Sequence, residues 1–305
     1  MDTIRKIRKV FKSKPTIEGA GVHLSRAFGN SEAPLFDPFL LLDDFRSDNP
    51  RHFLPGFPWH PHRGIETITY VLAGDVEHGD SMGNAGVIGS GDVQWMTAGS
   101  GIIHQEMPKG NAEGHMDGFQ LWANLPSSHK MMDPRYRDVK SNLIPVVTGA
   151  NGVTTRVICG SVDGVTGPVT DIVTDPEYLD ISIPPGTETW HPTKPGHTVI
   201  AYVIEGRARF CGEKNPFGYE AFGANYFDFQ RDSWMTNGNL VLFGDGDRIN
   251  VSTDGDFPAR FLLMSGRPIG EPVAWYGPIV MNTREELETA FDELNNGKFI
   301  KSKGK

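Results

Sequence analysis

Two short segments of the chain each carry a pair of metal-binding side chains two residues apart: His60 and His62, then His104 and Glu106. In a β-strand, side chains at positions i and i+2 leave the same face, so each pair points in one direction. If both strands lie across one barrel interior, the two pairs converge. Three neutral imidazoles and one carboxylate can hold a divalent metal and leave two octahedral positions open for a substrate or dioxygen. The spacing therefore predicts a β-fold with a metal site inside it.

The alternative is that these histidines only pack or form hydrogen bonds. A single histidine on an apolar strand usually has such a structural role. Here, however, three of the ten histidines of the chain fall into one arrangement with a carboxylate. Burying the four groups together without a metal would leave several polar atoms in need of partners. The pattern favours a metal site.

Composition agrees with a β-rich protein. The 305 residues include 36 glycines and 22 prolines, and 38% of them are hydrophobic, which is typical of short strands joined by many turns and leaves room for two modest cores. A net charge of −9 argues against a direct nucleic-acid binder. Basic residues at positions 5–14 alternate with apolar ones, and we interpret this run as a solvated edge strand rather than a nucleic-acid or import signal.

Cysteine usage and hydropathy indicate a reduced, intracellular setting. Cys159 and Cys211 are the only cysteines, and their spacing suggests neither a disulfide framework nor a thiolate zinc site. We find no secretion signal in the first thirty residues and no run of 18 apolar residues. We therefore expect a soluble cytoplasmic protein without membrane association, with a nuclear location possible if the source is eukaryotic.

Strand and turn signals divide the chain in two. Strands are predicted at 65–72, 87–88, 93–96 and 118–125, separated by glycine-rich turns, and the stretch 130–136 reads as a linker. We predict an all-β protein with one domain over 1–135 and a second over 136–305. The second half repeats the pattern of the first near 197–206, and a capped amphipathic helix over 283–295 closes the chain.

The repeat in the second half is degenerate. It contains neither an H-x-H pair nor an H-x-E pair. We expect its His191 and His197 to be turn and surface residues rather than a second metal site.

Several ordered blocks of the sequence identify a family. The spacings His60-x-His62-x3-Glu66-x7-Gly74 and Gly91-x7-Gly99-x4-His104 resemble the two halves of the cupin signature. Five blocks between about residues 37 and 283 resemble pirin, and the most specific are Trp-Met-Thr-Ala-Gly at 95–99 and His-Gln-Glu-Met-Pro at 104–108. The resemblance implies a bicupin of two tandem antiparallel β-barrels, with one iron in the first barrel and a second barrel that has lost its metal.

Carried over to this chain, the resemblance implies that His60, His62, His104 and Glu106 are the metal ligands. Glu66 is the ambiguous residue, because a general cupin uses the glutamate after H-x-H as a ligand. At about 3.3 Å per residue, Glu66 lies roughly 13 Å along the strand from His62 unless Gly64 forms a bulge. We therefore expect Glu66, and with it Arg63, to support the ligands from outside the metal's coordination.

The resemblance further implies a quercetin 2,3-dioxygenase, which opens flavonols with O2 and releases CO. A flavonol 3-hydroxyl and its neighbouring carbonyl can chelate the two open positions, and Glu106 is the candidate base for the hydroxyl proton. Alternation along the strand near 119–125 makes three residues candidates for substrate contact: Gln120, Trp122 and Asn124.

Two other functions stay open. The metal could serve a non-enzymatic, iron-binding redox sensor that regulates a protein partner or transcription factor, as the resemblance implies for eukaryotic members. A cupin isomerase would need a cationic clamp for a sugar phosphate, and only Arg63 is placed for one. The resemblance favours Fe(II), although a site of three nitrogens and one oxygen also suits Mn, Co, Ni, Cu or Zn.

Overall fold

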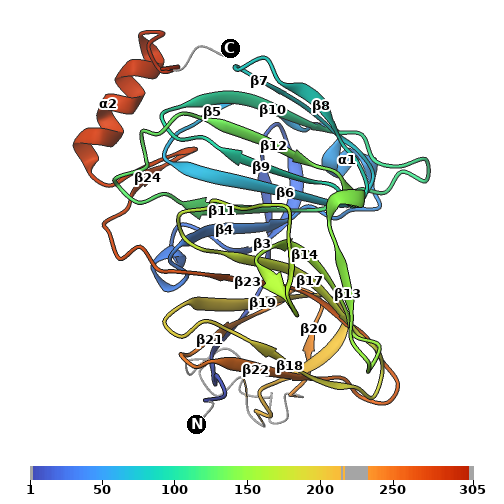
Figure 1. Ribbon diagram of the computed structural model, residues 1–305. Helices are drawn as coiled ribbons and strands as arrows, with labels where there is room; N and C mark the ends of the chain where they lie inside the picture. The colour runs from blue at the N-terminus through green and yellow to red at the C-terminus, as the bar shows by residue number, and fades with distance from the viewer. Residues whose placement is uncertain (1–2, 214–215, 217–232, 302–305) are drawn as a thin grey trace, which may run out of the picture. The chain divides into compact units, whose positions relative to one another are not determined.

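Antiparallel strands make up most of the protein (Figure 1). The computed structural model describes residues 3–213, 216 and 233–301. Every ladder between named strands in this part of the chain is antiparallel. The predicted all-β class is confirmed. None of the helices described is long and apolar enough to span a membrane.

The chain forms two compact units. Each unit contains most of one half of the chain together with the terminal segment of the other half. The histidine unit comprises Lys14–Leu143 and Ile269–Lys305, and the companion unit comprises Met1–Ser13 and Ile144–Pro268. This partition differs from the predicted division at 135/136. The difference arises because strand pairing and helix packing, rather than order in the sequence, determine where the two terminal segments lie.

The histidine unit contains two main sheets. The seven-stranded sheet has the order β12-β9-β6-β11-β4-β3-β2, and the four-stranded sheet has the order β5-β10-β7-β8. Its strands are β2 (Lys14–Glu18), β3 (Val22–Phe28), β4 (Phe39–Asp44), β5 (Phe57–His62), β6 (Ile65–Ala73), β7 (Val76–Asp80), β8 (Ala85–Ile88), β9 (Val93–Thr97), β10 (Ile102–Pro108), β11 (Asp117–Asn124), β12 (Arg135–Val139), β24 (Ala274–Tyr276) and β25 (Ile279–Met281). Short helices are η1 (Ala33–Leu35), α1 (Pro50–Phe53) and η2 (Ser141–Leu143). The four strands predicted between residues 65 and 125 are present, as are strands at the two ligand pairs, but sequence reasoning missed β2, β3, β4, β7, β12, β24 and β25.

The companion unit is organised around the path β1-β21-β19-β23-β17-β14-β13. Its strands are β1 (Ile7–Lys12), β13 (Val146–Thr148), β14 (Thr154–Cys159), β15 (Ser161–Val162), β16 (Val165–Thr166), β17 (Glu177–Ile183), β18 (Glu188–Pro192), β19 (Thr198–Phe210), β20 (Met235–Thr236), β21 (Asn239–Phe243), β22 (Arg248–Ser252) and β23 (Ala259–Gly266). The basic run near the amino terminus forms β1 at the end of this path, as expected for an edge strand. Apolar side chains of β1, β17, β19, β21 and β23 fill one continuous core.

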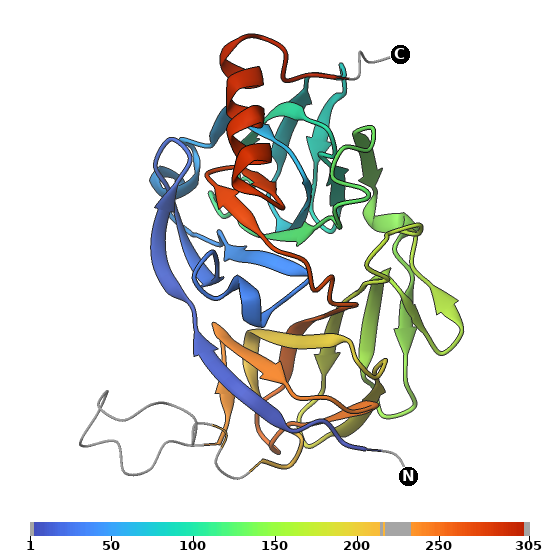
Figure 2. The same ribbon diagram turned by 90° about the vertical axis from the view of Figure 1, so that its left-hand side faces the viewer.

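The carboxy-terminal segment belongs to the histidine unit. Helix α2 (Arg284–Asn295) begins after Thr283, whose side chain accepts a hydrogen bond from the backbone of Glu286, while the Glu286 carboxylate accepts from the backbone of Thr283. In Figures 1 and 2 the red helix lies beside the hairpin β24–β25, and β25 contacts β5. Ala290 is buried in a small cluster with Ile279 and Met281. The predicted helix and its packing role are confirmed.

Candidate metal centre

Strands β5 and β10 bring three histidines together. The strands pair in antiparallel register with the Cα of His104 opposite that of His60, and His62 leaves the same face of β5 as His60. Pro61 lies between them, which is tolerated because β5 is at the edge of its sheet. One nitrogen of each imidazole lies within 4.8 Å of those of the other two, so these three residues form a group that could hold a metal ion.

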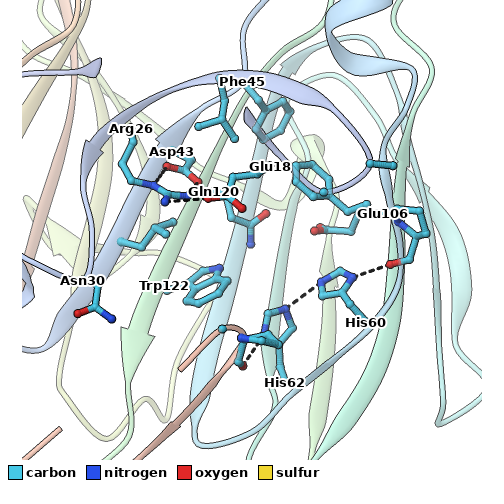
Figure 3. Close-up of a pocket in the computed structure, with 18 of the residues that line it drawn as sticks. Glu18, Arg26, Asn30, Asp43, Phe45, His60, His62, Glu106, Gln120 and Trp122 are labelled. Carbon is cyan, nitrogen blue, oxygen red and sulfur yellow. Dashed lines mark hydrogen bonds and ion pairs between the residues drawn. The ribbon is translucent and has the colours of Figure 1, made fainter. Parts of the chain in front are cut away.

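Backbone carbonyls orient two of the three rings. His60 Nδ1 lies 2.8 Å from the carbonyl oxygen of Pro58, and His62 Nδ1 lies 3.0 Å from that of Pro278. Because a carbonyl oxygen only accepts, each Nδ1 carries the proton of a neutral ring and each Nε2 presents a lone pair. The two Nε2 atoms are 3.0 Å apart (Figure 3). Two lone pairs facing each other at this distance fit a shared cation.

The third ring has no hydrogen-bond partner in the described structure. His104 is fully buried, and neither its Nδ1 nor its Nε2 makes a hydrogen bond. Burial lowers the pKa of His104 and of His62 well below the usual range, and the neighbouring imidazoles add to the effect, so both rings are neutral at pH 7. An unpaired buried imidazole costs free energy that a metal bond would offset. The donors therefore fit a divalent metal.

Glu106 lies next to this group without being part of it. It follows His104 by two residues on β10 and is buried, and Figure 3 shows its side chain in the cavity beside His60. Its Oε1 accepts a hydrogen bond of 2.6 Å from Thr69 Oγ1. The group of ligand atoms contains the three histidines alone. In the ladder with β5, His104 pairs with His60 but Glu106 pairs with Phe57, so the extra residue of this register shift lies on β5.

A cavity of about 600 Å³ opens onto His60, His62 and Glu106. The predicted residues Gln120 and Trp122 both line it, from β11. The Trp122 ring meets His62 edge-on at 5.0 Å and lies 5.9 Å from Trp275. The other apolar side chains of the wall are Ala20, Leu24, Leu41, Phe45, Phe57, Pro58, Trp59 and Pro278. The cavity thus joins the metal-binding group to a chamber that contains several aromatic rings.

Asn124, the third residue predicted to contact substrate, is not in the wall of this cavity. The side chain of Asn124 accepts a hydrogen bond of 2.7 Å from Lys130 Nζ, which also donates to the carbonyl oxygens of Gly64 and Val280. Burial lowers the pKa of Lys130 to about 7. Gly64 has a φ of +79°, and a Cβ there would lie 1.9 Å from the Val280 oxygen. Lys130 therefore joins the turn after β5 to β25.

Arg63 also contacts the carboxy-terminal segment. Its side chain is 2% exposed, donates to the carbonyl oxygens of Ser100 and Phe299 at 2.7 and 2.9 Å, and pairs with Glu293 at 2.8 Å. It does not line the cavity. A clamp for a sugar phosphate needs a cation that reaches the site, so this placement removes the one residue that favoured an isomerase.

Glu66 is buried on β6, beyond a turn that ends β5 after His62. Its Oε1 accepts a hydrogen bond of 2.6 Å from Thr97 and lies 3.7 Å from Arg135 Nη2. Burial raises the pKa of this carboxyl group. These contacts lie within the seven-stranded sheet, and none of those described joins Glu66 to an imidazole.

Sequence reasoning missed two contributors to the site. Thr69 lies in a predicted strand, but nothing in its neighbourhood marks it as the partner of Glu106. Pro278 lies in one of the blocks that carry the family resemblance, yet no sequence signal places it beside His62, 216 residues away. Both depend on the folding of distant segments.

Comparison with known proteins agrees with this geometry. Two family models match, Pirin over residues 21–123 and the pirin C-terminal cupin domain over 178–300. A pirin-like protein of Caulobacter vibrioides is 43% identical, with 97% of this chain and 99% of that protein covered. A Pseudomonas aeruginosa protein provisionally named quercetin 2,3-dioxygenase is 38% identical, with the same coverage. The crystal structure of a quercetin 2,3-dioxygenase from Acinetobacter baumannii matches with a TM-score of 0.82 at 29% identity, covering 97% of this chain and 99% of that one. The predicted architecture of two cupin domains is confirmed.

Proposed function

The chain belongs to the pirin family, and from this premise we propose that it is a metal-dependent dioxygenase that opens flavonols of the quercetin type. One O2 is consumed and one CO is released for each flavonol opened. The observation that carries the proposal is a single cavity whose wall contains two members of the three-histidine group, a buried carboxylate and several aromatic rings.

The ligands we propose are His60, His62 and His104, with Glu106 as a fourth, and the metal we propose is Fe(II). Neutral imidazoles suit this ion, and a carboxylate would complete the set. When bound, the metal supplies a Lewis acid for the flavonol 3-hydroxyl and a redox centre for dioxygen.

Proton transfer falls to Glu106. Its carboxylate lies in the wall of the cavity, where it can take the proton of the 3-hydroxyl. Thr69 Oγ1 lies 2.6 Å from this carboxylate and 2.9 Å from Gln120 Oε1, and its single proton serves one of them at a time. The charged carboxylate is the stronger acceptor. Once Glu106 is protonated, it can donate to the Thr69 oxygen instead, so one hydroxyl stabilises both states.

The aromatic wall orients the substrate and excludes water. A flavonol is flat, and the rings of Trp122 and Trp275 lie close together beside His62. Stacked or edge-on contacts with such rings favour a planar aromatic molecule over a sugar or an aliphatic acid.

The decisive experiment loads the protein with Fe(II), measures its metal content, adds quercetin without oxygen and then admits air. We expect a change in the quercetin absorption on binding and, after oxygen, loss of the flavonol with one CO per turnover. If fully Fe(II)-loaded protein binds flavonols but does not cleave them, the dioxygenase proposal is refuted. If its affinity for a protein partner then changed with iron oxidation, the redox-sensor function would replace it.

A further inference from the structure

The cavity has a second polar end, built from charged residues of three strands. Glu18 of β2, Arg26 of β3 and Asp43 of β4 all line the same cavity as the histidines. Figure 3 shows Arg26 and Asp43 on the far side of Gln120 from His60 and Glu106, with Glu18 beside Gln120. The proposed chemistry at the metal does not use any of these three residues.

Strand register connects the two ends. Arg26 is paired with Asp43, Asp43 with Gln120, and Gln120 with Thr69, so the four residues form one row across β3, β4, β11 and β6. Directly paired residues of antiparallel strands share a face. Three strand spacings of about 4.8 Å place the ends of the row roughly 14 Å apart. That is on the scale of a planar three-ring molecule, and the Thr69 end of the row contacts Glu106.

Arg26 is held rigidly, whereas Glu18 has freedom to adjust. Arg26 Nε and Nη2 donate to the two carboxylate oxygens of buried Asp43 at 2.8 and 2.7 Å. This fork leaves Nη1 directed at Glu18, whose Oε1 is 2.9 Å away and whose side chain is 42% exposed. A ligand that reaches this end therefore meets a fixed donor and an adjustable acceptor.

The charges at this end select the kind of group that binds. One guanidinium and two carboxylates give a formal sum of −1, so an anionic carboxylate or phosphate is disfavoured. A neutral hydroxyl can donate to Glu18 and accept from Arg26 Nη1 at the same time. A phenol matches both requirements, and its ring would lie against the apolar wall formed by Leu41, Phe45 and Trp122.

We propose that Glu18 and Arg26 form a recognition site for a phenolic hydroxyl on a terminal ring of the substrate, remote from the metal. This proposal rests on the proposed function. It adds a physical reason why the protein would prefer some flavonols over others. A flavonol that lacks the hydroxyl forgoes charge-assisted hydrogen bonds to Glu18 and Arg26 while still displacing water from them, so the site favours the hydroxylated flavonol.

The test compares three flavonols on Fe(II)-loaded protein: one hydroxylated on the fused ring, one on the pendant ring, and 3-hydroxyflavone with neither. We expect wild type to favour at least one hydroxylated flavonol over 3-hydroxyflavone by about tenfold or more in kcat/KM. Glu18→Gln should bring that preference close to one by lowering kcat/KM for the favoured hydroxylated flavonol. Glu77→Gln, at an exposed Lys109–Glu77 pair outside the cavity, should leave the preference intact.

Failure of this proposal is distinguishable from failure of the dioxygenase. The dissociation constants of the same flavonols, measured without oxygen by tryptophan fluorescence, report the preference even if no flavonol is cleaved. Equal affinity and turnover for all three in wild type, or an undiminished preference in Glu18→Gln, would overturn the recognition site and leave the dioxygenase standing. Tight, hydroxyl-dependent binding without cleavage would overturn only the dioxygenase.

Discussion

The two units share an antiparallel design but treat their histidines in opposite ways. In the histidine unit, two imidazoles leave one face of β5 and meet a third from β10, which has no hydrogen-bond partner in the described structure. In the companion unit, His191 on β18 has Glu177 as its partner, with Nε2 and Oε2 3.0 Å apart. The expectation that His191 is a turn or surface residue was wrong, because it is buried within a strand.

The difference shows that a histidine on a cupin strand is available to a metal only when no neighbouring side chain already pairs with it. An imidazole with a carboxylate partner is already satisfied, whereas three imidazoles with converging lone pairs are not. Of the described residues, only those of the histidine unit form a group of three potential donors. Each prediction below changes one residue in each unit and asks whether the contrast persists.

The largest effect is expected for loss of a proposed ligand. His104→Ala should lower metal affinity more than about 100-fold and abolish flavonol cleavage, because the remaining ligands, two histidines and Glu106, hold a divalent ion less tightly. His191→Ala should leave metal content unchanged. Elemental analysis after dialysis against a weak chelator measures both, with circular dichroism to verify folding. Metal that persists in His104→Ala but disappears from His191→Ala would assign the site to the companion unit.

Local periodicity explains what the sequence could predict of the site. His60 and His62 share a face because strand geometry repeats every two residues, and the same rule placed Gln120 and Trp122 in one cavity wall. It failed for Asn124, whose side chain accepts a hydrogen bond from Lys130 Nζ at the end of β11 and does not line the cavity. A periodic rule gives the face of a side chain but not how far along the strand the cavity extends.

Contacts between distant segments explain what the sequence could not predict. The strand pattern and the closing helix follow from turns, alternation and a capping box, all of them local. The division at 135/136 assumed that neighbours in sequence stay together, yet Arg63 holds Phe299 and Glu293 across more than 200 residues. The pairing of β1 with β21 likewise spans most of the chain. Such contacts depend on the whole fold.

The second prediction compares Glu106, the carboxylate beside the three histidines, with Glu177, the half-buried partner of His191. Glu106→Gln nearly preserves volume and keeps a coordinating oxygen, but it removes the base. We expect metal to be largely retained and kcat to fall on the order of 100-fold. Glu177→Gln, which changes the partner of His191, should leave kcat unaltered. Stopped-flow absorbance of quercetin gives kcat, and an unchanged value in Glu106→Gln would exclude its role in proton transfer.

The third prediction compares two buried arginines that anchor terminal segments. Arg63 binds the carboxy-terminal segment, and Arg5 donates to Thr193 Oγ1 and to the carbonyl oxygens of Gly244 and Lys194. Replacing either arginine by methionine should lower the free energy of unfolding by about 2–4 kcal/mol, since buried acceptors lose their donors. Urea titration measures this loss.

Only Arg63→Met should also weaken metal binding, by about tenfold, because Pro278, which orients His62, belongs to the segment that Arg63 anchors. Competition with a chromophoric chelator measures the affinity. Equal metal affinity in Arg63→Met and Arg5→Met would mean that the carboxy-terminal segment does not position His62.

The smallest effect should appear in the pH dependence of stability, through Lys130. Its pKa is about 7 in the folded protein against an ordinary 10.5, so between these values the unfolded chain holds the extra proton. Stability therefore rises with pH in this window, and the contribution of Lys130 should increase by about 1–2 kcal/mol from pH 7 to 9. Lys130→Met should remove that increment, whereas Lys194→Met, at an exposed lysine of the companion unit, should keep it. Urea unfolding of metal-free protein at several pH values gives the slopes, and parallel slopes for wild type and Lys130→Met would show that Lys130 stays protonated among its three oxygen acceptors.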